Sequence, residues 1–190
     1  MTTSTSATDL RAGAAGRLSP ETLMGVVLAG SVLAAAALVH FGAGGRGLIA
    51  GGLCASVVAL AAYDLEHRLI PNRIVLPAIA LILVAQIVAF PGDALEWLGG
   101  TVGAGVALYV PRLFKRDAVG IGDVKLAMLL GAGLGGEVVS ALLFGSLAAA
   151  PVAIWILATR GETERGQTIP LGPFLAVGAI LAVFLGDLPA

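Results

Sequence analysis

The sequence predicts an all-α fold, namely a polytopic bundle of about seven transmembrane helices, with six as the alternative count. Of its 190 residues, 58% are apolar and only 12% are charged, and the mean hydropathy is +0.98. A soluble domain carries about 25% charged residues, so this chain has too little polar surface to coat a soluble globule. The composition therefore excludes a secreted disulfide scaffold, a nucleic-acid-binding protein and a cytosolic enzyme.

The apolar residues form runs separated by short charged or Gly/Pro-rich breaks. Each run has about 17–22 residues, the length that a helix needs to cross the hydrocarbon core of a membrane. Strands of about ten residues with alternating polarity are absent, which leaves helices as the expected spanning structure. The expected spans are residues 23–41, 47–64, 74–90, 95–112, 118–136, 138–159 and 169–187.

The elements follow in order along the chain. Residues 1–20 are rich in Ser, Thr and Ala, which predicts a disordered cytoplasmic tail before a single membrane-embedded domain of residues 21–190. The first run begins at Leu23, later than the apolar core of a cleaved signal peptide, so we expect it to remain as a span. Charged loops near residues 65–73, 112–117 and 160–168 end the second, fourth and sixth runs. If Gly135-Gly136-Glu137 is not a turn, the fifth and sixth runs form one span and the count is six.

The positions of the charges support the seven-span arrangement. Of the 11 Lys and Arg residues, only Arg46 falls on the side opposite to the tail and the three charged loops. Basic residues gather on the cytoplasmic side of membrane proteins. The sequence therefore predicts that the tail and these loops face the cytoplasm.

Small residues and aromatic residues bear on how the spans pack. Trp97 and Tyr109 lie near span ends, which fits anchoring at the membrane interface. Glycines also recur four residues apart, a spacing that lets membrane helices approach closely. We expect packing roles for the pairs Gly47/Gly51, Gly99/Gly103 and Gly131/Gly135.

Two carboxylates stand out, because ionisable groups inside a membrane are costly and mark functional sites. Asp64 ends the second expected span, and Asp123 lies about five residues into the fifth, on the same cytoplasmic side. Two neighbouring carboxylates that share a proton are the minimum machinery of an aspartic protease. The alternatives without a catalytic role are that Asp64 is a solvated residue flanking the span, and that Asp123 is a helix cap or a charge at the membrane edge.

The helix dipoles suggest separate roles for the two carboxylates. Asp64 lies at a helix end, where negative charge is disfavoured, and Asp123 lies near a helix start, where it is favoured. We therefore expect Asp123 to act as the base and Asp64 as the acid, although such a pair titrates together. Gly120 and Gly122 would leave bare backbone beside Asp123 for an approaching substrate strand.

Three segments resemble the type IV prepilin peptidases, in that family's order. Residues 64–73, with Asp64 and Leu-Ile-Pro-Asn-Arg, resemble the first catalytic segment, and Gly-Ile-Gly-Asp-Val-Lys-Leu at 120–126 resembles the Gly-x-Gly-Asp motif. Residues 169–178 are similar to the last span of the family. The resemblance covers residues 47–187 and implies an intramembrane aspartic endopeptidase that removes the short leader of prepilin-like precursors at the cytoplasmic face.

The resemblance also assigns residues. It implies that Asp64 and Asp123 are the catalytic pair, and that the residues that bind substrate or shape the site are Gly120, Gly122, Lys125, Pro71, Asn72, Pro170, Gly172 and Pro173. For Lys125, a side chain that reaches lipid headgroups is an equal alternative. The expected partners are pilin, pseudopilin, Flp-type or archaellin-type precursors, the lipid bilayer, and pilus or secretion assembly components, with no nucleic acid.

The chain departs from the bifunctional members of that family. Those members carry a cytoplasmic insert with paired zinc cysteines that is linked to N-methylation. This sequence has one cysteine, Cys54, and a zinc site needs about four ligands. We therefore expect peptidase activity without N-methyltransferase activity, no metal and no cofactor.

Other functions remain as alternatives. A proton- or cation-coupled transporter would use Asp64 and Asp123 as its pathway, but it would predict internal repeats or acids that face both sides. A protease of the signal-peptide-peptidase type would share the pair Tyr63-Asp64, but it would need Pro-Ala-Leu near the end, where this chain has Pro170-Leu171-Gly172. An inactive assembly subunit with the same fold is the third alternative.

Overall fold

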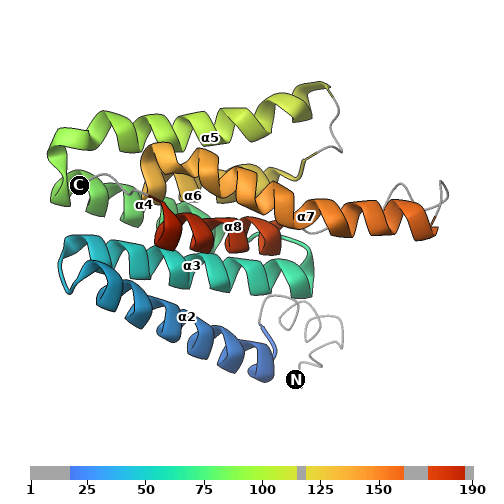
Figure 1. Cartoon of the computed structure of the whole chain (residues 1–190), viewed down its shortest axis with the longest axis horizontal. Coiled ribbons are helices and arrows are strands. Elements are labelled where there is room, and N and C mark those ends of the chain that lie inside the picture. Colours follow the sequence, from blue (N-terminus) through green and yellow to red (C-terminus); the bar gives the residue numbers. More distant parts are fainter. Residues whose placement is uncertain (1–17, 115–118, 161–170, 187–190) are drawn as a thin grey trace, which may run out of the picture.

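The structure is a computed structural model that describes residues 18–114, 119–160 and 171–186. The described residues form seven α-helices and two short 3₁₀ turns, without a strand, which confirms the all-α prediction (Figure 1). The helices are α2 (Pro20–Phe41), α3 (Gly45–His67), α4 (Asn72–Ala89), α5 (Ala94–Phe114), α6 (Ile121–Leu134), α7 (Val138–Arg160) and α8 (Gly172–Leu185). The turns are η1 (Pro91–Asp93) and η2 (Gly135–Glu137). The expected disordered tail lies almost entirely outside the described residues.

The helices identify a multi-pass membrane protein. Four stretches are long and apolar enough to cross a membrane: Pro20–Phe41, Gly45–His67, Asn72–Ala89 and Ile121–Trp155, the last of which includes η2. Helices α6 and α8 have 14 residues each. Each is therefore about 21 Å long, shorter than the expected spans 118–136 and 169–187.

The break at Gly135 is a turn. Gly135 has a φ of +56°, a left-handed conformation that glycine adopts readily. Near the start of α6, Gly122 lies against Ile70, which follows the end of α3. Near the end of α6, Gly133 lies against Leu53, in the middle of α3. Helix α6 therefore runs antiparallel to α3.

Helix α7 runs back in the opposite direction to α6. Its residue Gly145 lies against Leu175, whereas Ala141 lies against Gly178 further along α8, so α7 and α8 are antiparallel. Helix α8 itself begins beside Asp64, at the end of α3, and is therefore antiparallel to α3. The sixth expected span is thus a helix separate from α6, and the number of membrane spans stays a prediction.

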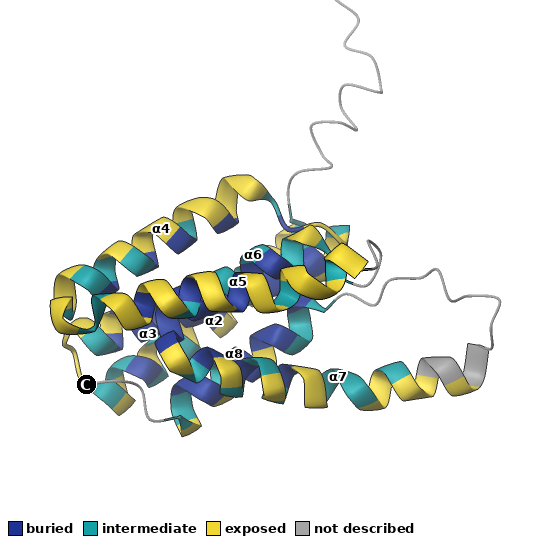
Figure 2. Ribbon diagram, turned by 90° about the horizontal axis from the view of Figure 1, so that it is seen from above, coloured by how far each residue is buried: buried dark blue, intermediate teal, exposed yellow. Residues whose placement is uncertain are grey.

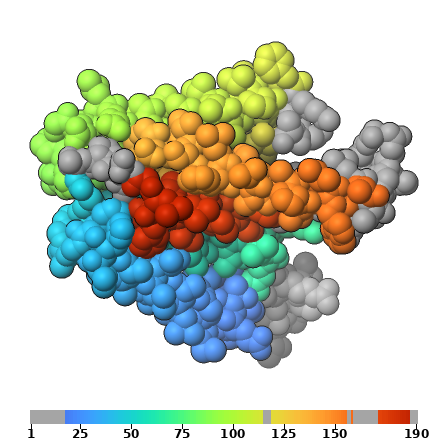
Figure 3. All heavy atoms as spheres, viewed as in Figure 1, coloured from blue at the N-terminus to red at the C-terminus, as the bar shows by residue number. Residues whose placement is uncertain are grey.

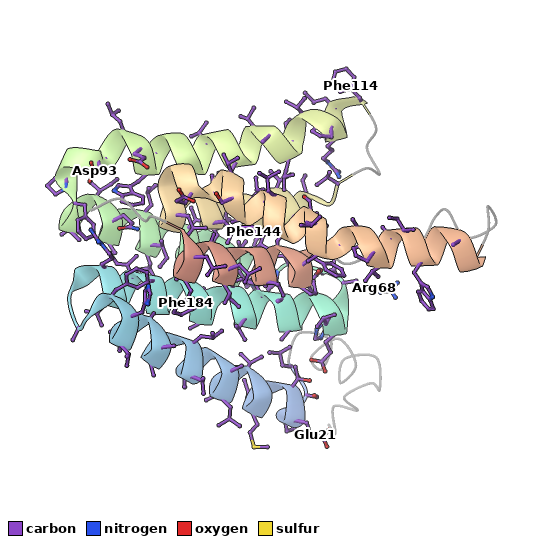
Figure 4. The ribbon with its side chains drawn as sticks, viewed as in Figure 1. Glu21, Arg68, Asp93, Phe114, Phe144 and Phe184 are labelled. Carbon is purple, nitrogen blue, oxygen red and sulfur yellow. The ribbon has the colours of Figure 1, made fainter. Side chains whose placement is uncertain are left out.

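The bundle has two distinct ends. Glu21, Arg68 and Phe114 lie toward one end, and Asp93 and Phe184 lie toward the other (Figure 4). Helices α3, α5 and α7 all end toward the first end (Figure 1). This is the grouping that the charge pattern predicts for the cytoplasmic side.

Helices α3, α6 and α8 form the core. Nine of the 14 residues of α6 are buried, and burial is concentrated where these three helices face one another (Figure 2). Helix α2 packs mainly on α3, with one edge-to-face ring contact between His40 and Phe184 of α8, and it exposes most of its surface, as expected for a lipid-facing helix. Helices α7 and α8 lie side by side between α5 and α2 on the face shown in Figure 3.

The glycine pairs behave differently from one another. A Cβ atom on Gly131 would lie 2.1 Å from the carbonyl oxygen of Gly100, so α5 and α6 pack backbone to backbone at this point. Gly99 and Gly103 have nothing within 4 Å, so the expectation that they pack inside the bundle is wrong. These two glycines lie on the outward face of α5, because Gly100 takes the inward position.

Trp97 also departs from expectation. Its side chain is 2% exposed and packs against Gly135, so it is a core residue and not an interface anchor. Tyr109 is half-exposed on the outer face of the same helix, where an interface anchor would lie.

Candidate active site

Asp64 lies in the last turn of α3 and is buried. Its Oδ2 atom accepts a hydrogen bond from the backbone N–H of Gly172, the first residue of α8, at 3.2 Å. A Cβ atom on Gly172 would lie 2.6 Å from the same Oδ2 atom, well inside van der Waals contact. Glycine at position 172 therefore allows the start of α8 to close onto this carboxylate.

Asp123 lies in the first turn of α6 and caps it. Its Oδ2 atom accepts a hydrogen bond from the backbone N–H of Gly120 at 3.2 Å, and its own N–H donates to the Gly120 carbonyl at 3.1 Å. This reciprocal arrangement satisfies free backbone groups at the helix start. The helix-cap interpretation is thus correct for one oxygen of Asp123, and it leaves the other oxygen available.

The structure brings the two carboxylates together from elements far apart in the sequence. A Cβ atom on Gly122 would lie 3.0 Å from Cβ of Ile70, so the start of α6 packs on the loop that follows α3. Asp64 and Asp123 are close enough for the charge of one to act on the other. The juxtaposition expected from the topology is therefore present.

The two carboxylates are held in the same way. Each uses Oδ2 to accept one backbone N–H, and no hydrogen bond from the described residues reaches either Oδ1 atom. Backbone donors hold a carboxylate in a fixed orientation without adding a competing side-chain charge. The arrangement can therefore present two free oxygens to a water molecule or a peptide carbonyl.

The helix dipoles do not separate the two carboxylates as expected. Asp64 lies at the end of α3, but it also faces the first N–H of α8. The positive end of the α8 dipole favours negative charge there and opposes the effect of α3. Both carboxylates therefore lie at a helix start, and the assignment of Asp123 as base and Asp64 as acid stays a prediction.

The glycines of the motif have contacts that the sequence did not reveal. A Cβ atom on Gly120 would lie 2.9 Å from Oδ2 of Asp123, whereas Gly122 faces Ile70. Both glycines are thus needed for close packing inside the protein. Their expected role in admitting a substrate strand stays a prediction.

Lys125 bonds to the first residue of α4. Its Nζ atom donates a hydrogen bond to Oδ1 of Asn72 at 2.5 Å. Pro71 precedes Asn72 and accepts the first backbone hydrogen bonds of α4, from Ile74 and Val75. This contact joins α6 to the start of α4, two residues along α6 from Asp123, and it favours a site-shaping role over the headgroup-reaching alternative.

The remaining expected site residues belong to the start of α8. Pro173 occupies the first turn of α8, where a proline needs no hydrogen-bond partner for its nitrogen. It follows Gly172 directly and is half-buried. Pro170 lies outside the described residues.

Two residues near the site were not singled out from the sequence. Ile70 is buried although it lies in a charged loop, and its apolar character was the available signal. Arg112 donates from its guanidinium to the Val119 carbonyl at 2.6 Å, which ties the end of α5 to the residue before Gly120. An arginine at the end of an apolar run gives no sequence signal for such a bond.

Within the described ranges, no group of three or more His, Cys, Asp and Glu side chains is placed to hold a metal ion. Cys54 is buried in α3, far along the helix from Asp64. The expectation of a site without metal or cofactor stays a prediction.

Comparison with known proteins gives one family. Residues 52–154 match the model of the type IV leader peptidase family. This match includes Asp64, Asp123 and the motif around each. No solved structure matches the chain.

Several relatives are similar over most of this chain, and each is named as a prepilin leader peptidase/N-methyltransferase. The protein from Burkholderia pseudomallei is 32% identical over 167 residues, covering 85% of this chain and 54% of the relative. The protein from Xanthomonas campestris is 35% identical over 170 residues, covering 85% and 58%. The protein from Bacillus subtilis is 30% identical over 134 residues, covering 69% and 53%. The chain thus spans about half the length of these relatives, and the matches give no support to the transporter or signal-peptide-peptidase alternatives.

Proposed function

Because the chain belongs to the type IV leader peptidase family, we propose that it is a membrane-embedded aspartic endopeptidase. Its substrates are type IV prepilin-like precursors, from which it removes the short leader peptide. The observation that carries the proposal is the meeting of Asp64 and Asp123, each held by a backbone N–H, at the end of the bundle that holds the basic loops.

The two carboxylates divide the chemistry of peptide hydrolysis between them. The ionised carboxylate takes a proton from water while the oxygen of that water attacks the peptide carbon. The protonated carboxylate donates to the carbonyl oxygen, and a tetrahedral intermediate forms. Its collapse breaks the C–N bond, and the carboxyl group that took the water proton passes it to the leaving amine. As the new carboxyl group of the product forms, a hydroxyl of the intermediate returns a proton to the other aspartate, so the pair regains its single proton.

The residues around the pair set its geometry. Gly172 and Gly120 supply the N–H groups that orient Asp64 and Asp123. Gly122 lets α6 approach the loop after α3, and Lys125 holds the start of α4 through Asn72. Pro71 and Pro173 fix the chain direction where α4 and α8 begin. Pro170, which lies outside the described residues, belongs to the set through the family resemblance alone.

We place the site at the cytoplasmic face of the cytoplasmic membrane. The basic residues in the tail and in the loops after α3, α5 and α7 support this orientation, because such residues stay on the cytoplasmic side. The substrate would then offer its leader from the cytoplasm while its apolar segment lies in the bilayer.

The partners of the reaction follow from the same proposal. The substrate class comprises pilin, pseudopilin, Flp-type or archaellin-type precursors, and pilus or secretion assembly components are the expected neighbours. N-methylation is named for the relatives. We do not expect it from these 190 residues, whose single cysteine cannot supply a cysteine-rich zinc site.

Co-expression with a candidate precursor tests the function. The chain is produced with a small protein that has a basic leader, a glycine junction and an apolar helix, in a host without its own prepilin peptidase. Leader removal is read by gel shift and N-terminal sequencing. Wild type should cleave, and Asp64→Asn and Asp123→Asn should not.

A matched control uses an acid at the other end of the bundle. Asp93→Asn removes a carboxylate from η1 and should leave cleavage intact. Equal cleavage by wild type and both catalytic variants would overturn the two-aspartate mechanism. A transporter does not cleave peptide bonds. Leader removal that depends on both aspartates would therefore also exclude the transporter alternative.

A further inference from the structure

A small cavity lies at the end of the bundle away from the aspartates. Its volume is about 10 Å³, measured as space open to the centre of a water molecule, and this is about the room that one water needs. Five helices contribute to its lining, through Arg46 and Leu53 of α3, Gln86 of α4, Trp97 of α5, Gly133 of α6 and Val183 of α8. The cavity is therefore enclosed by most of the core.

Gln86 brings an unpaired acceptor to this cavity. The residue is 5% exposed, and its Nε2 atom donates to the Gly133 carbonyl at 2.9 Å. That bond decides which end of the amide is nitrogen, because a carbonyl can only accept. The other end, Oε1, is buried and has no hydrogen-bond partner among the described residues.

Trp97 brings an unpaired donor. Its side chain is 2% exposed, and its Nε1 atom is buried without a partner in the described part of the chain. The edge of the indole that carries Cε3 and Cζ3 faces Gly135, at the surface turn η2. The Nε1 edge lies on the opposite side of the ring and is therefore turned away from η2, toward the interior.

Buried donors and acceptors without partners are rare in proteins, because each loses its hydrogen bonds to water on folding. Here an acceptor and a donor line the same water-sized cavity. We propose that this cavity is a binding site for a single water molecule, which donates to Oε1 of Gln86 and accepts from Nε1–H of Trp97. The bound water joins α4 to α5 in the half of the bundle opposite the aspartates.

The lining also selects against other small occupants. The indole N–H and the Arg46 guanidinium, which lies over the Phe90 ring at 5.7 Å, both present positive edges that disfavour a metal cation. The volume excludes an organic ligand. The inference rests on this cavity alone and does not depend on the proposed peptidase function.

Nuclear magnetic resonance of the detergent-solubilised full chain tests the site. The chain has two tryptophans, Trp97 and Trp155, so indole ¹⁵N labelling gives two signals that Trp155→Phe assigns. The Trp97 indole proton should show a cross-relaxation peak at the water frequency. Gln86→Met, which keeps the shape but removes the acceptor, should abolish that peak and shift the indole signal.

The control is Leu81→Met, a similar change on the exposed face of α4, which should preserve the peak. A resolved wild-type Trp97 signal without the water peak would overturn the proposal. This measurement uses the wild-type protein alone, so it does not depend on whether a variant folds. A water peak that survives Gln86→Met unchanged would overturn the role of Gln86. A contact between the Trp97 indole proton and the Gln86 side chain, with no water peak, would show a direct bond and overturn the site.

Discussion

Gly172 donates its backbone N–H to Oδ2 of Asp64 at 3.2 Å, across 108 positions of sequence. The bond joins the first residue of α8 to the last turn of α3. Asp123 receives an equivalent backbone bond from Gly120, but this partner lies only three positions away. One carboxylate is thus oriented by tertiary packing and the other by its own helix start, so they should respond differently to mutation.

Gly172→Ala should inactivate the protein without unfolding it. The new Cβ atom would lie 2.6 Å from Oδ2 of Asp64 and would push the carboxylate away. A displacement of about 1 Å at a catalytic group can cost about 10²-fold in rate, so we expect a loss of leader removal of that order. Gly103→Ala, at a site with nothing within 4 Å, is the control and should cleave normally. Normal cleavage by Gly172→Ala would argue against the role of this N–H.

Two adjacent glycines of α5 should differ in their effect on stability. Gly100→Ala would place Cβ 2.6 Å from the Gly135 carbonyl oxygen, and such overpacking costs about 1–3 kcal/mol. Gly99→Ala meets nothing within 4 Å and should be neutral or slightly stabilising, because alanine is the better helix former. Reversible unfolding in mixed detergent micelles measures both free energies. Equal losses for the two variants would mean that α5 is rotated differently.

Breaking the bond between Lys125 and Asn72 should slow cleavage several-fold. The bond holds the start of α4 against α6, and it is exposed, so its loss should be milder than that of Gly172. Lys125→Met and Asn72→Leu should each lower the rate. The double variant should be no slower than the slower single variant, because both remove one interaction. Independent, multiplying effects would show that each residue acts separately.

The rate of leader removal should pass through a maximum as the pH changes. The mechanism needs one ionised and one protonated carboxylate, so activity falls when both are protonated and when both are ionised. Initial rates at constant ionic strength, on protein shown to stay folded across the range, measure the profile. A rate that rises with pH and then stays constant would argue that the reaction does not need a protonated carboxyl group in the pair.

Much of the fold is readable from the sequence because it depends on local pattern. Apolar runs bounded by Gly, Pro and charge predict spans 23–41 and 74–90, close to α2 (Pro20–Phe41) and α4 (Asn72–Ala89). Because successive spans cross the membrane in opposite directions, the order of the runs also predicts that Asp64 and Asp123 lie at the same end of the bundle. These inferences need only helix length and charge position, not the rotation of any helix.

What could not be predicted depends on helix rotation and on distant contacts. The spacing rule treats Gly99 and Gly100 alike, but only Gly100 faces α6. Trp97 lies near a span end, yet it turns inward against Gly135. The contact of Gly172 with Asp64 needs the path of α8, which no local pattern in the sequence specifies.

The late position of α8 in the chain has a consequence for biosynthesis. Both aspartates are synthesised before Gly172, which follows Asp123 by 49 residues, and at about 5–20 residues per second this delay is roughly 2–10 s. During that interval Asp64 lacks the N–H that orients it in the finished bundle. The order of synthesis thus leaves the carboxylate pair without one of its orienting bonds until α8 has been made.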